Sequence, residues 1–289
     1  MDLSLLHETP PWDWPKDVRK TFLGLLKDRL APPADRLIAV DLAGDFTAIN
    51  DDLADALMAV LRDPGEPEEL RSRAAIAFGA VLEVASTEFD EELEDFEDEE
   101  MVPIGLETFL EIRELLQALY ADGNVPNLVR RRILEAAVRA PDTWQEGAIR
   151  EAYASGDRDW ILTAVFAMRF VGDFENEILE ALKTTDPEIH VEAVLAAGEE
   201  ELDAAWPHIL KLAKDGRTEK DLRIAAIGAM GSIRPEEAQD ILFELKDSKD
   251  EDIAEAADEA LSMILPDEDD EDEEDFDEED DKEEDEDEE

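Results

Sequence analysis

The sequence contains no cysteine and only three histidines among its 289 residues. The lack of cysteine excludes disulfides, thiolate metal sites and cysteine nucleophiles. Long hydrophobic runs are missing as well: uncharged stretches such as 74–82 are about half of the ~18 residues that a membrane span requires. The N-terminus lacks the basic region and the apolar run of a signal peptide. We therefore expect a cytoplasmic protein with no membrane partner.

Catalytic signatures are also missing. We find no G-x-S-x-G, no P-loop, no G-x-G-x-x-G and no H-E-x-x-H. Acidic side chains are so numerous that neighbouring carboxylates carry no information about acid–base catalysis. We therefore expect no enzymatic activity, no catalytic residue, no cofactor and no metal.

Basic residues are scarce, with 27 lysines and arginines against 82 acids, for a net charge of −55. Residues 267–289 hold 21 acids and one lysine, a net charge of −20, and residues 88–100 hold ten acids and no base. Segments with this much like charge cannot bury enough apolar surface to fold. We predict a disordered acidic insertion at 87–101 and a disordered acidic tail at 266–289.

Each acidic segment has two interpretations. The tail is either a solubilising extension or a contact for basic partners, with Phe276 as an aromatic anchor inside the polyanion. In the insertion, Phe89, Leu93 and Phe96 recur at spacings of four and three. They form either one amphipathic helical turn that docks on the folded part or a partner-binding motif.

The rest of the chain has helical periodicity. Within it a ten-residue pattern, called here the frame, recurs: apolar, Arg, two variable residues, Ala, two variable residues, Ala, apolar, Gly. Leu70–Gly79 and Leu222–Gly231 fit it best. Looser copies begin at Asp35, Leu128, Trp160, Ile189 and Ile253, and the one at Leu128 is the weakest. Successive copies are 29–35 residues apart, except for one interval of 58 that contains the acidic insertion.

The frame has a direct physical meaning. Its first, fifth, eighth and ninth positions share one helical face, and small alanines there let neighbouring helices approach closely. We expect the glycine to end the helix in a left-handed conformation. An amphipathic helix should precede each copy. These helices are predicted over 15–30, 50–62, 105–121, 143–155, 173–184, 200–215 and 235–247.

The frame and its period of ~30 residues resemble HEAT repeats, in particular the bacterial PBS-lyase HEAT-like type. The resemblance covers residues 15–265 and implies an all-α fold, a right-handed α-solenoid of about seven helix pairs. Repeats are expected over 15–86 and 102–265, after an extended segment at 1–14. Di-iron hydroxylases of this fold need several His–Glu pairs, and this chain has one, His7-Glu8. No motif of the lyases maps onto it.

Arginine gathers in one region of this acidic chain. Residues 125–170 contain seven arginines and six acids. The candidates for contact with an anion or a partner are Arg130, Arg131, Arg132 and Arg139. Arginine without lysine favours bidentate contacts with phosphate or carboxylate. Ion pairs between repeats are the alternative.

Aromatic and histidine side chains favour structural roles. We expect Trp144, Trp160 and Trp206 in the core, and His190 and His208 in contacts between repeats. Trp12 and Trp14 either cap the first helix pair or form an exposed aromatic anchor.

The function that these features favour is a non-catalytic protein-binding scaffold or adaptor. Its partner would be a protein, with a basic one favoured by charge, and no direct contact with nucleic acid is expected. One alternative is a regulator of nucleic-acid-associated proteins that mimics a polyanion. Another is a HEAT-like lyase-type enzyme. The oligomeric state stays open.

Overall fold

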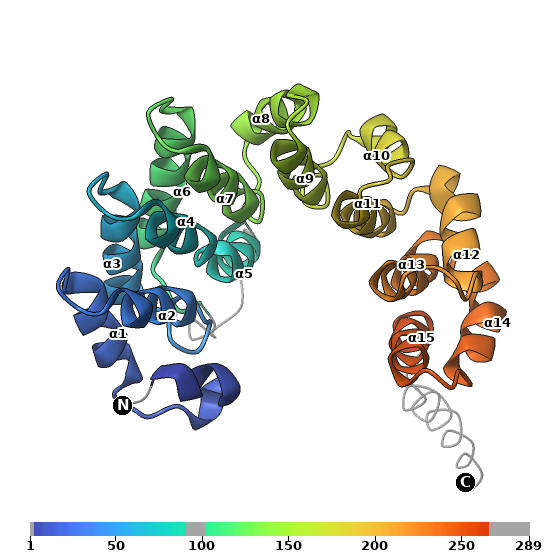
Figure 1. The fold of residues 1–289 in the computed structure, drawn as a ribbon, viewed down its shortest axis with the longest axis horizontal. Helices are drawn as coiled ribbons and strands as arrows, with labels where there is room; N and C mark the ends of the chain where they lie inside the picture. The colour runs from blue at the N-terminus through green and yellow to red at the C-terminus, as the bar shows by residue number, and fades with distance from the viewer. Residues whose placement is uncertain (1–2, 91–101, 266–289) are drawn as a thin grey trace, which may run out of the picture. The chain divides into compact units, whose positions relative to one another are not determined.

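The computed structural model describes residues 3–90 and 102–265, and in these residues it contains fifteen α-helices, three short 3-10 helices and no strand (Figure 1). The contacts divide the chain into unit 1, Met1–Phe174, and unit 2, Glu175–Glu289. The predicted all-α fold is confirmed.

Unit 1 stacks helices in two layers. The first helices of its pairs are α1 (Val18–Lys27), α3 (Asp51–Arg62), α6 (Leu106–Ala121) and α8 (Thr143–Ala154). The second helices are α2 (Pro33–Ala43), α4 (Glu68–Ile76), α7 (Asn127–Ala137) and α9 (Arg158–Ala167). Within the first layer α3 packs on α1 and α6, and within the second α4 packs on α2 and α7. Each copy of the frame lies in a second helix.

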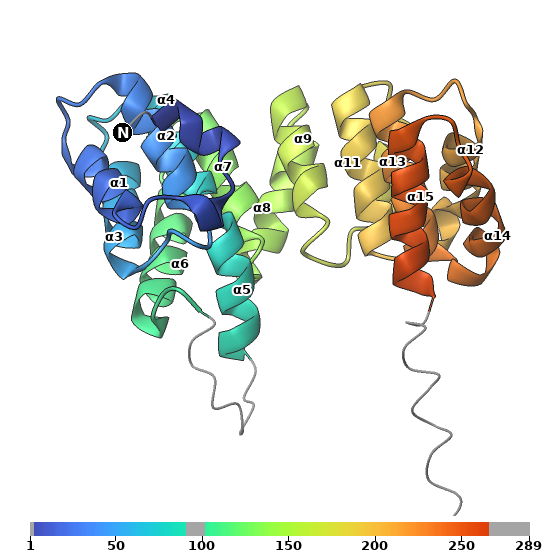
Figure 2. The ribbon, with the colours of Figure 1, turned by 90° about the horizontal axis from the view of Figure 1, so that it is seen from below.

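Unit 2 repeats this arrangement with three pairs. They are α10 (Glu175–Ala181) with α11 (Pro187–Glu199), α12 (Trp206–Lys214) with α13 (Lys220–Ile233), and α14 (Pro235–Lys246) with α15 (Glu251–Ile264). The second helices α11, α13 and α15 lie side by side (Figure 2). With four pairs in unit 1, the described residues hold the predicted seven.

One helix was not predicted. The α5 helix (Gly79–Asp90) follows α4 and packs on α6 and α7 (Figure 2). It extends past residue 87, the predicted start of the acidic insertion. Phe89 packs on Phe109 with ring centroids 5.3 Å apart. Since α3 packs on α6 and α4 on α7, the repeats before and after the insertion belong to one unit. Leu93, Phe96 and the rest of 91–101 lie outside the described residues.

The N-terminal segment is helical rather than extended, so that prediction is wrong. Two 3-10 helices, Leu3–Glu8 and Pro11–Asp13, precede α1, and the first packs on α2. Trp14 joins them to the repeats: its Nε1 donates to the carbonyls of Leu6 and Thr9. Its ring meets Phe22 edge-on at 5.9 Å. Apolar contacts in the first repeat therefore override the extended preference of the prolines.

Small residues of the frame make the contacts between second helices. The fifth position is fully buried in every copy that has alanine there. These residues are Ala39, Ala74, Ala164, Ala193, Ala226 and Ala257. Helices of 7–16 residues are marginal on their own, so this packing supplies most of their stability.

The frame glycine does not have the predicted left-handed conformation. Gly44 has φ −83°, and Gly198 and Gly231 lie within helices. Among the described residues, the glycine with positive φ is Gly156. The frame glycines instead allow close approach, because a Cβ on Gly198 would lie 2.9 Å from the Cβ of Ala229 in the next second helix.

The same contact recurs along the stack. A Cβ on Gly44 would lie 2.3 Å from the carbonyl oxygen of Ala77, and one on Gly231 would lie 3.4 Å from that of Ala260. Ala77, Ala229 and Ala260 all hold the eighth position of the following frame. In these three repeats the glycine therefore packs against an alanine of the next, whereas Gly79 lies against the side chain of Arg139.

Two glycines in neighbouring helices of unit 2 allow a matched test. Gly198→Ala should destabilise the protein, by about 1–3 kcal/mol as for overpacking, because the added methyl meets Ala229. Gly228 lies in α13 with open space around it, so Gly228→Ala should stabilise by about 0.8–1 kcal/mol through helix propensity. Chemical denaturation followed by circular dichroism measures both. Equal effects of the same sign would contradict the close contact.

Candidate functional site

The arginine at the second position of the frame has a structural role. Its Nε–H donates to a carbonyl in the last turn of the first helix of the pair. Four repeats show this bond: Arg36 to Leu25 at 3.3 Å, Arg71 to Leu61 at 2.9 Å, Arg130 to Tyr120 at 2.8 Å and Arg223 to Ala213 at 2.9 Å. The last carbonyls of a helix have no partner within it and carry the negative end of its dipole. The arginine therefore caps its partner helix.

This bond corrects the register of the weakest copy. The frame was placed to begin at Leu128, but Arg130 makes the capping bond that Arg71 makes in its own repeat. The copy therefore begins at Val129, which is fully buried. Ile133, Ala136 and Ala137 then fill the fifth, eighth and ninth positions, all of them buried.

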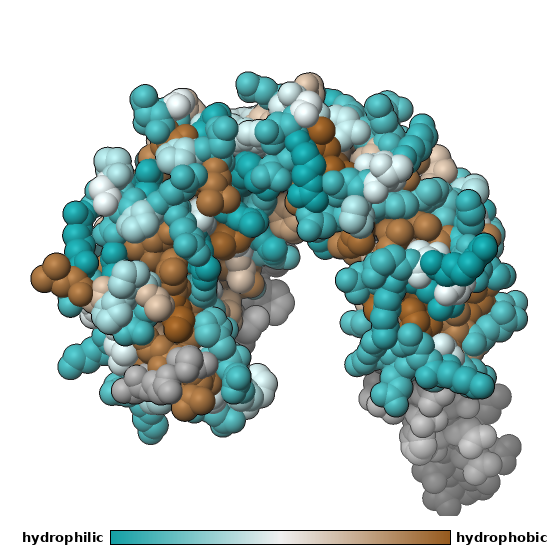
Figure 3. Space-filling model, in the orientation of Figure 1, coloured by the Kyte–Doolittle hydropathy of each residue, from teal (hydrophilic) through white to brown (hydrophobic). Residues whose placement is uncertain are grey.

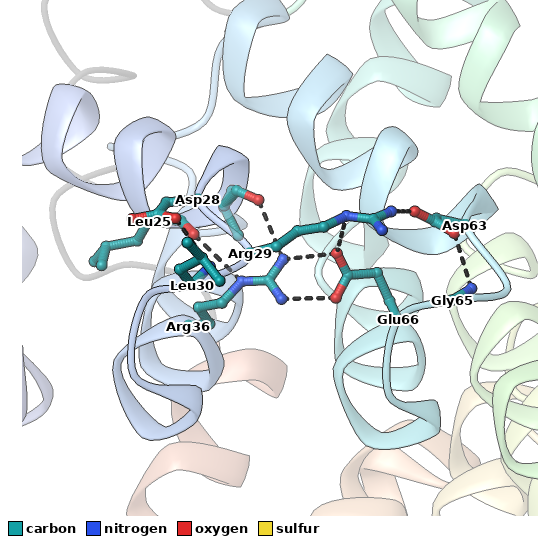
Figure 4. Close-up of polar contacts among 9 residues, drawn as sticks. Leu25, Asp28, Arg29, Leu30, Arg36, Asp63, Gly65 and Glu66 are labelled. Carbon is teal, nitrogen blue, oxygen red and sulfur yellow. Dashed lines mark hydrogen bonds and ion pairs between the residues drawn. The ribbon is translucent and has the colours of Figure 1, made fainter.

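The first capping arginine also joins two repeats (Figure 4). Arg36 is 5% exposed and forms a bidentate pair with Glu66 at 2.6 and 3.0 Å. The hydrogen bonds from Arg36 hold the pKa of Glu66 below its ordinary value, and the charge of Arg29 adds to this. Arg29 itself pairs with Asp63. Bidentate pairing fixes geometry as well as charge.

A second arginine network lies on α7 and α9. Arg131 donates from Nε to Thr163 Oγ1 at 3.0 Å and pairs with Asp159 at 2.8 Å. The Thr163 hydroxyl donates to Glu135 at 2.6 Å, and Glu135 also pairs with Arg132. Thr163 is fully buried and Glu135 is 6% exposed. The network thus ties two repeats together through a buried carboxylate.

Arg130 lies between aromatic rings. Its guanidinium carbon is 5.0 Å from the ring centroid of Tyr120 and 5.5 Å from that of Trp160. Trp144 packs on the other side of Tyr120, with centroids 5.1 Å apart. Burial raises the pKa of the Tyr120 hydroxyl, although Arg130 opposes the shift.

A small cavity of about 110 Å³ opens beside Arg130. It is lined by Tyr120, Arg130, Glu151, Ala152, Ser155 and Trp160. Within the part of the chain that the structure describes, Arg130 makes no ion pair, unlike the other three candidate arginines. The interpretation of Arg130 as an anion contact therefore stays a prediction.

The fourth candidate, Arg139, points at another aromatic pair. It forms an ion pair with Glu83, and its guanidinium carbon is 5.0 Å from the ring centroid of Phe170 and 5.8 Å from that of Phe166. Its Nε is buried without a hydrogen-bond partner among the described residues. Sequence reasoning missed the phenylalanines, although their spacing of four from Phe166 to Phe170 places them on one side of the chain as α9 ends.

The Trp14 and Phe22 contact places Trp14 in the N-terminal cap. Trp12 is 79% exposed. Trp206 is buried, with Arg234 over its ring at 5.5 Å. Phe276 lies outside the described residues.

Replacing Thr163 should show what the α7–α9 network contributes. Thr163→Val keeps the volume but removes a hydrogen bond from the buried Glu135 carboxylate, so the free energy of unfolding should fall by about 1–3 kcal/mol. Thr163→Ser retains the hydroxyl and is the matched control. Denaturant unfolding of both variants measures this, and a Thr163→Val variant as stable as the Ser variant would contradict the network.

His190 and His208 form a pair in unit 2. Their Nε2 atoms lie 2.9 Å apart, so one donates and the other accepts when both are neutral. His190 occupies the frame's arginine position but contacts the next first helix, α12. Burial lowers the pKa of both imidazoles; the charge of His208 adds to the shift at His190, and that of Lys211 to the shift at His208.

The histidine pair should make unit 2 sensitive to acid. Because both folded pKa values are lowered below 6.5, the unfolded chain binds more protons as pH falls through 6.5. The stability that depends on neutral His190 and His208 is fully present above pH 6.5. It is lost as the pH falls through the pKa values of the two imidazoles in the folded protein. NMR titration of the three imidazoles should place His190 and His208 below 6.5, and His208→Gln should raise the pKa of His190. Midpoints at or above 6.5 would contradict the pair.

Comparison with known proteins agrees with this architecture. Residues 175–262 match the family model described as HEAT repeats, so unit 2 is built from HEAT repeats and the predicted resemblance is confirmed there. The structure of human deoxyhypusine hydroxylase in complex with glycerol is similar at 18% identity over 85% of this chain and 95% of that chain, with a TM-score of 0.37. No curated protein matches the sequence.

In residues 3–90 and 102–265, no three or more histidine or acidic side chains lie together in a way that could hold a metal ion. No helix in these ranges is long and apolar enough to cross a membrane.

Proposed function

We propose that the chain is a non-catalytic protein-binding scaffold whose partners are basic. The observation that carries the proposal is how its few cations are used. Arginines at frame positions cap helices, and Arg131, Arg132 and Arg139 pair with acids of their own unit. These arginines are thus engaged internally, whereas acids outnumber all the lysines and arginines threefold, 82 to 27.

Electrostatics then favours one class of partner. A surface of one sign raises the rate of encounter with opposite charge and suppresses encounter with like charge. A protein with a net charge of −55 therefore repels nucleic acid and attracts basic proteins. Stacked helix pairs offer continuous surfaces for such a partner, as repeat proteins generally do.

Affinity capture on the immobilised full-length protein tests this function. A nuclease-treated lysate is loaded at low salt, bound proteins are eluted with rising salt, and each is then purified and tested for direct binding. We expect basic proteins that bind directly and dissociate as salt screens the charges. Acidic or neutral partners whose binding ignores salt would contradict the proposal. If the direct partners are nucleic-acid-binding proteins that added DNA displaces, the result favours the regulator of nucleic-acid-associated proteins instead.

A further inference from the structure

A groove between the last two helices of unit 2 has no assigned role. It has a volume of about 450 Å³, within the range of 300–1,000 Å³ that is typical of ligand sites. Its lining residues are Phe243 and Lys246 of α14, and Glu255, Asp258, Glu259, Leu261, Ser262 and Leu265 of α15 and its end. Figure 3 shows hydrophobic surface among hydrophilic side chains over this unit.

The groove exposes large apolar side chains. Phe243 is 47% exposed and Leu265 is 36% exposed, while Leu261 beneath them is buried. In the preceding pairs of unit 2, the next repeat packs on the second helix, as α13 packs on α11 and α15 on α13. No further repeat covers α14 and α15 among the described residues. Within the described residues, the groove is therefore an apolar surface that no repeat covers.

The rim of the groove is acidic. Glu255, Asp258 and Glu259 are all exposed along α15. The one cation of the lining, Lys246, pairs with Asp258, so Glu255 and Glu259 leave a net negative rim. An apolar floor with such a rim fits an apolar side chain flanked by lysines or arginines.

The sequence that follows the groove is strongly acidic. Leu265 lines the groove, and 21 of the 23 residues from Asp267 to Glu289 are acidic. This segment has a net charge of −20 and lies outside the described residues.

We propose that this groove binds a basic amphipathic segment of a partner protein, with an apolar side chain on Phe243 and Leu265 and its cations on Glu255 and Glu259. An amphipathic helix laid in a hydrophobic groove is a common form of peptide recognition. This inference rests on the proposed function, because it names the site and the chemistry of the basic partner.

The test uses two fluorescent peptides and the full-length protein. One peptide has leucines at positions i, i+3, i+4 and i+7 with lysines elsewhere, and the other has alanine in place of each leucine. Fluorescence anisotropy gives Kd at low and at high salt. The variants are Phe243→Gln and a matched control, Leu110→Gln, since Leu110 on α6 is 46% exposed but lies in unit 1.

The groove predicts that the leucine peptide binds more tightly than the alanine peptide. Phe243→Gln should weaken the leucine peptide by about tenfold or more, as for an anchor residue, whereas Leu110→Gln should leave Kd unchanged. Glu255→Gln with Glu259→Gln should weaken it at low salt and much less at high salt, because salt screens exposed charges.

Two other outcomes distinguish a failure of the proposed groove site from a failure of the proposed function. If both peptides bind equally well and Phe243→Gln changes neither, the groove is not the site, although basic ligands still bind the acidic segments. If neither peptide binds even at low salt, the proposed preference for basic partners fails together with the groove.

Discussion

The close contact between successive second helices is the constraint on which the repeats depend. Where glycine meets the eighth-position alanine of the next frame, as at Gly198 and Ala229, the helices approach until there is no room for one more methyl group. The fully buried fifth-position alanines, such as Ala193 and Ala226, extend that contact along each helix. Helices this short gain their stability from such packing rather than from propensity.

The arginine bond supplies what packing cannot. A helix that ends inside a stack leaves carbonyls without partners, and buried unpaired carbonyls are costly. Arg71 and Arg223 reach back to the last turn of the preceding helix and satisfy one of them. The same bonds hold these guanidinium groups against the helices, and the acids, which outnumber lysine and arginine 82 to 27, set the sign of the net charge. The core of the repeat and its proposed choice of partner are therefore linked through one residue type.

Much of the fold could be predicted because the frame is local: residues four and seven apart share a face, so the alanines revealed seven helix pairs. Features that depend on contacts with other repeats could not be predicted. The role of Gly198 needs Ala229, 31 residues away, and a glycine inside a helix looks like a glycine that ends one. Because residues 130–132 are all arginine, the sequence alone does not show which of them holds the second position of the frame. Among candidate sites, the ion pair of Arg131 depends on Asp159 of the next repeat. The groove at Phe243 depends on how α14 and α15 pack and on the absence of a further repeat over them among the described residues.

A double-mutant cycle between Gly198→Ala and Ala229→Gly tests the central contact most directly. If the two residues touch, removing the methyl of Ala229 relieves the closest of the contacts made by the methyl added at Gly198, although the Cα of residue 229 still lies 3.0 Å from it. The double variant should then be more stable than the sum of the single effects predicts, by about 0.5–3 kcal/mol, the range for residues in contact. Effects that add within about 0.3–0.5 kcal/mol, as for distant residues, would show that the helices do not meet there and would contradict this account of the repeat.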